Sequence, residues 1–103
     1  MYARVITFSG ADSDKRDGAM DMIRGTVLPM LRTYDGYEGY ISLYDEESSR
    51  AQALILWESK DAADAAEETL AERRQGMVSQ IGITIDSVDL YEAPVVELEG
   101  ARV

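Results

Sequence analysis

The stretch over residues 50–58 is predicted to be a β-strand with apolar side chains on both faces. Successive residues of a strand point to opposite sides of the sheet. One face carries Ala51, Ala53, Ile55 and Trp57, and the other carries Leu54 and Leu56 between Gln52 and Glu58. Antiparallel sheets commonly have one polar, solvated face, so this strand predicts a sheet that is covered on both sides.

The rest of the chain alternates between strand and helix patterns. Further strands are predicted over residues 2–9, 37–45 and 83–91, where β-branched and aromatic residues alternate with polar ones. One helix is predicted between the first two strands and another between the last two. The order β-α-β-β-α-β is typical of an α+β, ferredoxin-like fold with a four-stranded antiparallel sheet. A single domain is expected over residues 1–103.

Capping and helix-breaking residues mark the ends of both helices. Ser13 is expected to be the N-cap of the first helix and Ser59 that of the second. Pro29 is expected to kink the first helix or end it early, and Gly82 to end the second. The apolar stripes at helical spacing are Met20, Ile23, Val27 and Leu31 in the first helix, and Ala63, Ala66, Leu70 and Met77 in the second.

Two helices can cover only one face of such a sheet, which leaves the second apolar face without cover. The strand over 37–45 is also two-sided, because Ile41 and Leu43 oppose Tyr40 and Tyr44. A second copy of the chain would bury this face, so a homodimer is expected. The tail over 93–103 is expected to contact the partner subunit.

The charge balance limits the classes of partner. The net charge is −10 and the isoelectric point is about 4.3. Nucleic acid and anionic membrane surfaces are not expected partners, because both need Lys and Arg to replace their counterions. The start of the chain alternates like a strand and lacks a signal-peptide pattern, so a cytoplasmic location is expected.

Several residue types used in catalysis and metal binding are missing. The chain contains no Cys, His or Asn, so neither Ser-His-Asp nor Cys-His catalysis can be built and structural zinc is not expected. The run Asp12-x-Asp14-x-x-Asp17-Gly18 departs from a calcium loop, because its Gly falls one place late and Ile23 stands where the terminal Glu belongs. No metal site and no cofactor are expected.

Two short motifs carry a family resemblance. The first, Gly36-Tyr37-Glu38-Gly39-Tyr40, opens the second strand, and the second, Trp57-Glu58-Ser59, ends the third strand before an Ala- and Glu-rich helix. These motifs resemble those of the antibiotic biosynthesis monooxygenase-like group, and so do their order and spacing. The resemblance covers the chain from residue 2 to about residue 94. The resemblance implies a dimeric α+β barrel with a ligand cleft between the sheet and the helices.

The resemblance also implies site residues, only some of which are present. Oxygenases of the group act without a cofactor on phenolic compounds and use an Asn on strand three, a Trp at its end and an aromatic hydroxyl or Arg. Trp57 matches that Trp, whereas Ala53 stands where the Asn would be. The group's haem-degrading enzymes use a His, which this chain lacks. On the first strand, Arg4 is the residue expected to face the cleft.

Arg4, Tyr40, Tyr44, Trp57 and Met77 are therefore expected to line one cavity. Trp57 suits stacking on a planar ligand or plain core packing. Arg4 would either pair with a carboxylate such as Asp89 or stabilise an oxyanion of a ligand. The tyrosines would bind the ligand or, more simply, pack at the dimer face, and Met77 would bind the ligand or join the core.

Two functions follow, and the sequence leaves both open. One is a cofactor-independent monooxygenase-like enzyme for a small aromatic or enolisable compound, with Trp57 and Arg4 as catalytic residues and Tyr40, Tyr44 and Met77 as ligand-binding residues. The other is a non-catalytic dimeric protein that binds a small molecule or serves as an accessory protein. The missing Asn and His favour the second, and the resemblance favours the first.

Overall fold

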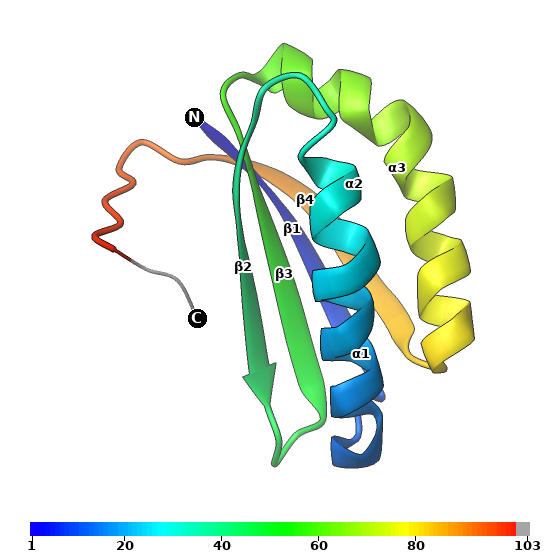
Figure 1. Ribbon diagram of the computed structural model, residues 1–103. Coiled ribbons are helices and arrows are strands. Elements are labelled where there is room, and N and C mark those ends of the chain that lie inside the picture. The colour runs from blue at the N-terminus through cyan, green and yellow to red at the C-terminus, as the bar shows by residue number, and fades with distance from the viewer. Residues whose placement is uncertain (101–103) are drawn as a thin grey trace.

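The computed structural model describes residues 1–100 and contains one four-stranded antiparallel sheet with helices on one face (Figure 1). The strands lie side by side in the order β2-β3-β1-β4. Their bounds are Tyr2–Ser9 for β1, Tyr37–Asp45 for β2, Arg50–Trp57 for β3 and Thr84–Glu92 for β4. The predicted α+β, ferredoxin-like fold is confirmed, and the first three strands begin where the sequence pattern places them.

The first helical region is built from four short segments. They are a 3₁₀ turn η1 (Ser13–Lys15), α1 (Arg16–Met22), a π-helical segment η2 (Ile23–Val27) and α2 (Leu28–Leu31). The prediction that Ser13 is the N-cap is wrong, because Ser13 already lies inside η1 and Asp12 precedes it without a side-chain cap. Pro29 has no N–H to bond the carbonyl of Gly25, and the widened π turn lies directly before it.

The second helix, α3 (Lys60–Ile81), has the predicted ends. The Ser59 side chain accepts a hydrogen bond from the Ala62 N–H at 3.1 Å, and Gly82 ends the helix in the left-handed conformation. Its buried face differs from the predicted stripe in the last two turns, where Arg74 and Val78 are buried. Met77 lies beside that face and is half-buried.

The core lies between the helices and the face of the sheet that they cover. Ile6, Leu31 and Trp57 are its largest fully buried side chains. Register pairs Trp57 with Tyr2 and Tyr37, and Ile55 with Arg4 and Tyr40, so these side chains share the helix-covered face. Leu54 and Leu56 of β3 lie on the other face, opposite Val5 and Ala3, so the predicted two-sidedness of β3 is confirmed.

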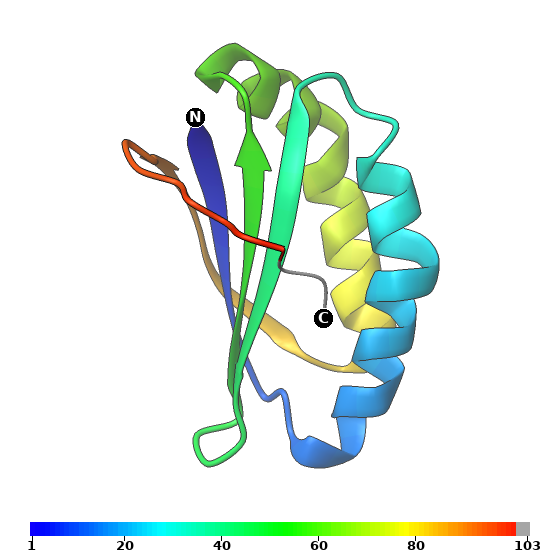
Figure 2. The same ribbon diagram turned by 60° about the vertical axis from the view of Figure 1, so that its left-hand side comes forward.

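The helix-free face of the sheet also carries apolar side chains, beside polar ones such as Gln52 and Asp89. Figure 2 shows that the chain after β4 runs back on this side of the sheet. Leu43 and Tyr91 expose 46% and 58% of their surface, and the tail itself presents exposed Val95 and Leu98. The tail predicted over residues 93–103 is described as far as residue 100, and residues 101–103 lie outside the described residues.

The two glycines of the first motif have different structural reasons. Gly36 has a φ of 82°, and a Cβ there would lie 2.5 Å from the Cβ of Ala62 at the start of α3. Its carbonyl accepts a hydrogen bond from the Glu58 N–H at 2.9 Å. Gly39 lies at a register shift of β2 and faces Leu56. Only glycine allows the close approach of the β2 entrance to α3.

Candidate functional site: an apolar cavity between the helices and the sheet

A cavity of about 130 Å³ lies between the helix-covered face of the sheet and the helices. By the same measure a water molecule needs roughly 10–15 Å³, so there is room for about ten water-sized groups. Apolar side chains form almost all of its walls. The strands contribute Ile6, Phe8, Tyr40, Tyr44, Ala51, Ala53 and Ile55, and the helical segments contribute Ala19, Met20, Ile23, Val27, Leu31, Leu70, Met77, Val78 and Ile81.

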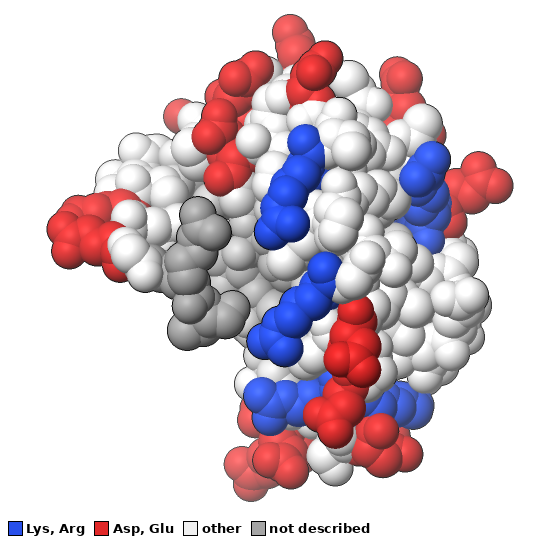
Figure 3. All heavy atoms as spheres, viewed as in Figure 1, with Lys and Arg blue, Asp and Glu red and all other residues white. Residues whose placement is uncertain are grey.

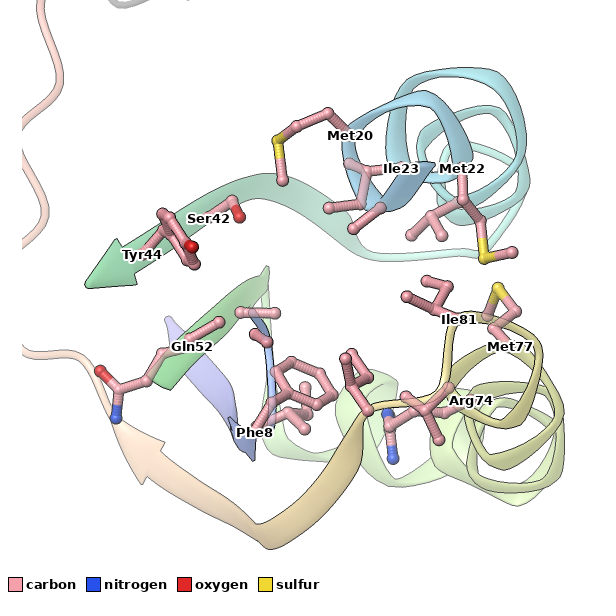
Figure 4. A pocket seen from close by; sticks show the side chains of 18 of the residues that line it. Phe8, Met20, Met22, Ile23, Ser42, Tyr44, Gln52, Arg74, Met77 and Ile81 are labelled. Carbon is pink, nitrogen blue, oxygen red and sulfur yellow. The ribbon is translucent and has the colours of Figure 1, made fainter. Parts of the chain in front are cut away.

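Methionine is concentrated at this cavity. Four of the chain's five methionines, Met20, Met22, Met30 and Met77, line it. Figure 4 shows Met20 reaching from α1 toward β2, and Met22 and Met77 meeting where α1 approaches α3. Methionine is flexible and polarizable and makes favourable contacts with aromatic rings, so these walls can adapt to a flat apolar guest.

The cavity opens between the start of α1 and the edge strand β2. The exposed side chains among its lining residues are Asp12, Arg16, Ser42 and Leu43. The guanidinium carbon of Arg16 lies 5.2 Å from the centre of the Tyr44 ring, a cation–π contact. Arg16 and Tyr44 therefore form two sides of the opening.

Lys15 fixes the position of this opening. Its Nζ donates hydrogen bonds to the carbonyls of Gly82 at 2.8 Å and Gly10 at 3.2 Å, and it lies 3.8 Å from the carboxylate of Asp12. On the other side, the Ala11 N–H donates to the Ser49 carbonyl in the β2–β3 hairpin at 2.9 Å. The segment before α1 is thus tied both to the end of α3 and to the hairpin.

The two predicted tyrosines, Tyr40 and Tyr44, both line the cavity, but their hydroxyl groups have different surroundings. Burial, partly opposed by the nearby Ser42 hydroxyl, raises the pKa of Tyr40 to about 12. Tyr40 therefore stays protonated near neutral pH and cannot serve as a general base there. The Tyr44 hydroxyl oxygen is buried and has no hydrogen-bond partner among the described residues. The expectation that the tyrosines pack at the dimer face is wrong, because both lie on the helix-covered face.

Trp57 lies in the core and does not line the cavity. It is 1% exposed, and the rings of Tyr34 and Tyr37 pack edge-on against it at centroid distances of 6.3 and 6.0 Å. The Tyr34 hydroxyl forms a hydrogen bond with the Thr69 hydroxyl of α3 at 2.7 Å. Of the two alternatives for Trp57, this surrounding matches core packing.

Arg4 also lies away from the cavity, under α3. Its side chain is 11% exposed and lies 3.7 Å from the carboxylates of Asp64 and Glu67. The prediction that Asp89 pairs with Arg4 is wrong, because the strand register places Asp89 opposite Val5 on the other face of the sheet. Arg4 is therefore neutralised by two carboxylates, which weakens any pull on a ligand oxyanion.

Glu67 and Arg74 complete a charged network that the sequence pattern did not predict. Arg74, on the cavity wall, donates two hydrogen bonds to the Glu67 carboxylate at 2.8 and 2.9 Å. Burial raises the pKa of Glu67, but the hydrogen bond and charge of Arg74 and the charge of Arg4 outweigh it, so the pKa is lowered overall. The two residues lie seven positions apart, beyond the spacings of three and four that signal a helix pair.

The predicted site residues therefore divide into two groups. Tyr40, Tyr44 and Met77 line the cavity, whereas Trp57 and Arg4 lie outside it. Residue Arg16 was not predicted, because an exposed Arg on a helix start carries no sequence signal of its own. Within residues 1–100, no group of three or more acidic, His or Cys side chains is placed to hold a metal ion, and no helix is both long and apolar enough to cross a membrane.

Several proteins of known structure share this architecture. No protein-family model matches the chain. A Deinococcus radiodurans protein provisionally assigned as an antibiotic biosynthesis monooxygenase superposes with a TM-score of 0.71 at 15% identity, over 97% of this chain and 100% of that one. The chain has the antibiotic biosynthesis monooxygenase-like fold. The ActVA-Orf6 monooxygenase of Streptomyces coelicolor, in complex with Nanaomycin D, has this fold too, with a TM-score of 0.70 and 16% identity over 96% of this chain and 92% of that one.

Curated relatives of this chain add a sequence link without a function. Two uncharacterised proteins of Mycobacterium tuberculosis, MT2634 and Rv2557, are 32% identical to it over 84 residues, which is 82% of the chain. The chain spans 37% of the length of each of these relatives. A third similar structure is HapK of Hahella chejuensis, with a TM-score of 0.69 and 11% identity over 98% of this chain and 100% of that one.

Proposed function

We propose that the chain binds a small, largely apolar aromatic compound in the cavity between the helices and the sheet. The observation that carries this proposal is the cavity itself. Protein interiors are close-packed and rarely contain voids larger than a water molecule. An apolar guest inside this cavity of about 130 Å³ would gain roughly 25 cal/mol for each Å² of apolar area that it buries.

The walls favour an aromatic guest. Phe8, Tyr40 and Tyr44 offer ring surfaces, and Met20 and Met77 offer thioethers. Aromatic rings pack favourably against both groups. Tyr40, whose pKa is raised by burial, stays protonated near neutral pH and cannot serve as a general base there, and most of the other lining side chains are apolar. Binding without chemistry is therefore the better supported of the two functions.

A cavity-filling variant tests this proposal. Ala51 lines the cavity, so Ala51→Leu would occupy space that a ligand needs. Ala65→Leu on the exposed face of α3 is the matched control. In a thermal-shift screen with hydroquinones and anthrones, compounds that raise the Tm of the parent and the control should lose at least about tenfold in affinity for Ala51→Leu. A panel that shifts no Tm, or that shifts the filled variant equally, contradicts the proposal.

A second candidate function is cofactor-independent oxygenation of the same compound. It is supported by the fold shared with the Streptomyces coelicolor monooxygenase. In this function Trp57 and Arg4 would be the catalytic residues, although neither lines the cavity. Oxygen uptake by the protein with anthrones and hydroquinones tests it. Uptake that is absent, or that is unchanged in Arg4→Ala and Trp57→Phe, contradicts this candidate.

Two copies of the chain are proposed to pair through their helix-free sheet faces. Partly exposed Val5, Ile41, Leu43 and Leu54 lie on that face. A standard interface buries about 800 Å² on each partner, and apolar area contributes roughly 25 cal/mol per Å² before association costs. The exposed apolar residues Val95 and Leu98 of the tail lie on the same side and would be covered with it.

A further inference from the structure

The cavity opening carries a cation, Arg16, that packs on the Tyr44 ring but forms no ion pair among the described residues. Arg16 is exposed beside the cavity and forms no ion pair within residues 1–100. The other two cations that line the cavity are engaged, Lys15 by Asp12 and two carbonyls and Arg74 by Glu67. The chain has a net charge of −10, and this guanidinium, at the edge of an apolar cavity, is a positive charge that no ion pair among the described residues neutralises.

A second polar group lies next to it. The Tyr44 hydroxyl is buried and has no partner among the described residues, although buried hydroxyls nearly always form a hydrogen bond. The Arg16 guanidinium lies over the ring of the same tyrosine. Arg16 and Tyr44 therefore lie together at one end of the cavity. Most of the other lining side chains are apolar, and the two other cations among them, Lys15 and Arg74, are already paired.

The surface charge around the helices agrees with this arrangement. Figure 3 shows basic side chains along the middle of the face that carries α1 and α2, with acidic side chains both beside them and toward the edges. The acid that lies at the opening, Asp12, is 3.8 Å from Lys15 and is partly neutralised by it. Arg16 is thus a local positive charge at the opening of a cavity in an acidic protein.

We infer that the ligand is an amphipathic anion, with an aromatic body inside the cavity and a carboxylate at the opening. The carboxylate accepts a hydrogen bond from the Tyr44 hydroxyl and pairs with the Arg16 guanidinium. This inference rests on the proposed ligand binding and adds the class of headgroup. Hydrogen bonds to a charged acceptor are stronger than neutral ones, and the solvent at the opening reduces the gain. A preference of about tenfold over a neutral analogue is expected.

The test compares two ligands with the same ring system. At pH 7, 2-naphthoate is an anion and 2-naphthol is neutral, and both retain an oxygen that Tyr44 can bond. Isothermal titration of the protein should give about tenfold tighter binding of 2-naphthoate. Arg16→Gln should remove this preference while leaving 2-naphthol unchanged. Tyr44→Phe should weaken both ligands by roughly threefold to tenfold.

Arg24→Gln is the matched control. Arg24 is exposed on the same helical region but does not line the cavity, so the variant makes the same charge change and should keep the preference. The headgroup inference is overturned, while ligand binding stands, if 2-naphthol binds and 2-naphthoate binds no tighter. It is also overturned if Arg24→Gln reduces the preference for 2-naphthoate as much as Arg16→Gln does. If neither ligand binds the parent protein, the proposed function fails with it.

Discussion

Glu67 and Arg74 form a doubly hydrogen-bonded ion pair across two turns of α3, with N–O distances of 2.8 and 2.9 Å. Arg4 of β1 approaches the same carboxylate to 3.7 Å. One negative charge thus lies between two guanidinium groups that are each about one-tenth exposed. This carboxylate holds α3 to the central strand of the sheet.

Glu67→Gln should therefore destabilise the fold. The change leaves two nearly buried cations with a neutral neighbour, and hydrogen bonds to charged groups are worth about 1.5–3 kcal/mol. Because Glu67 keeps some contact with solvent, a loss of about 2 kcal/mol in the free energy of unfolding is expected. Urea denaturation measures it. Asp64→Asn, at a more exposed carboxylate, is the control and should cost less than about 1 kcal/mol.

The same carboxylate predicts a loss of stability in acid. The pKa of Glu67 in the folded protein lies below its ordinary value of 4.5. A group with a lowered pKa stabilises the fold above its unfolded-state pKa, and this contribution is lost as the pH falls through the folded pKa. The difference in unfolding free energy between the parent and Glu67→Gln should be constant near neutral pH and shrink below 4.5. A difference that grows in acid contradicts this prediction.

Gly36→Ala should be among the most damaging small substitutions in the chain. The positive φ disfavours any side chain by about 1–2 kcal/mol, and the new methyl group would press on Ala62 at 2.5 Å. A total loss of about 3 kcal/mol is expected. Gly18→Ala in α1 meets open space and should instead stabilise by about 0.5–1 kcal/mol. Thermal unfolding of the two variants checks both signs.

Leu54→Lys tests the proposed pairing of two copies. Leu54 lies on the helix-free face opposite Val5 and Ile41, so a lysine there would bury a charge in a dimer but remain near solvent in a monomer. Light scattering at micromolar concentration should give a mass of twice 11.4 kDa for the parent and for Ala65→Lys, and a lower mass for Leu54→Lys. A parent that scatters as a monomer rules out this pairing.

The periodicities of the sequence predict the fold well, because local patterns dominate it. The alternation over β1, β2 and β3, the cap at Ser59 and the stop at Gly82 are local signals, and the structure has them at the predicted positions. The π-helical segment is different. Its apolar residues follow ordinary helical spacing, so the extra residue in the turn is visible only when the tertiary contacts are known.

The candidate site was less predictable, because it depends on distances between distant residues. The pattern placed Arg4 and Trp57 on one face correctly, but not the tyrosines that pack around Trp57 or the carboxylates of α3 that neutralise Arg4. Conversely, Arg16 and Tyr44 are 28 positions apart in the sequence and come together only through the packing of α1 beside β2. The partners of Arg4 and the contact between Arg16 and Tyr44 both depend on how long side chains extend from one element to another.

The contacts of Lys15 have a consequence for the rates of ligand exchange. Breaking its two hydrogen bonds to backbone carbonyls would free the start of the first helical region from the end of α3. Such exposed bonds contribute about 1 kcal/mol each, whereas unfolding a whole domain costs about 5–15 kcal/mol. We therefore expect the proposed ligand to exchange through local opening of the segment before α1, on a timescale far shorter than that of global unfolding.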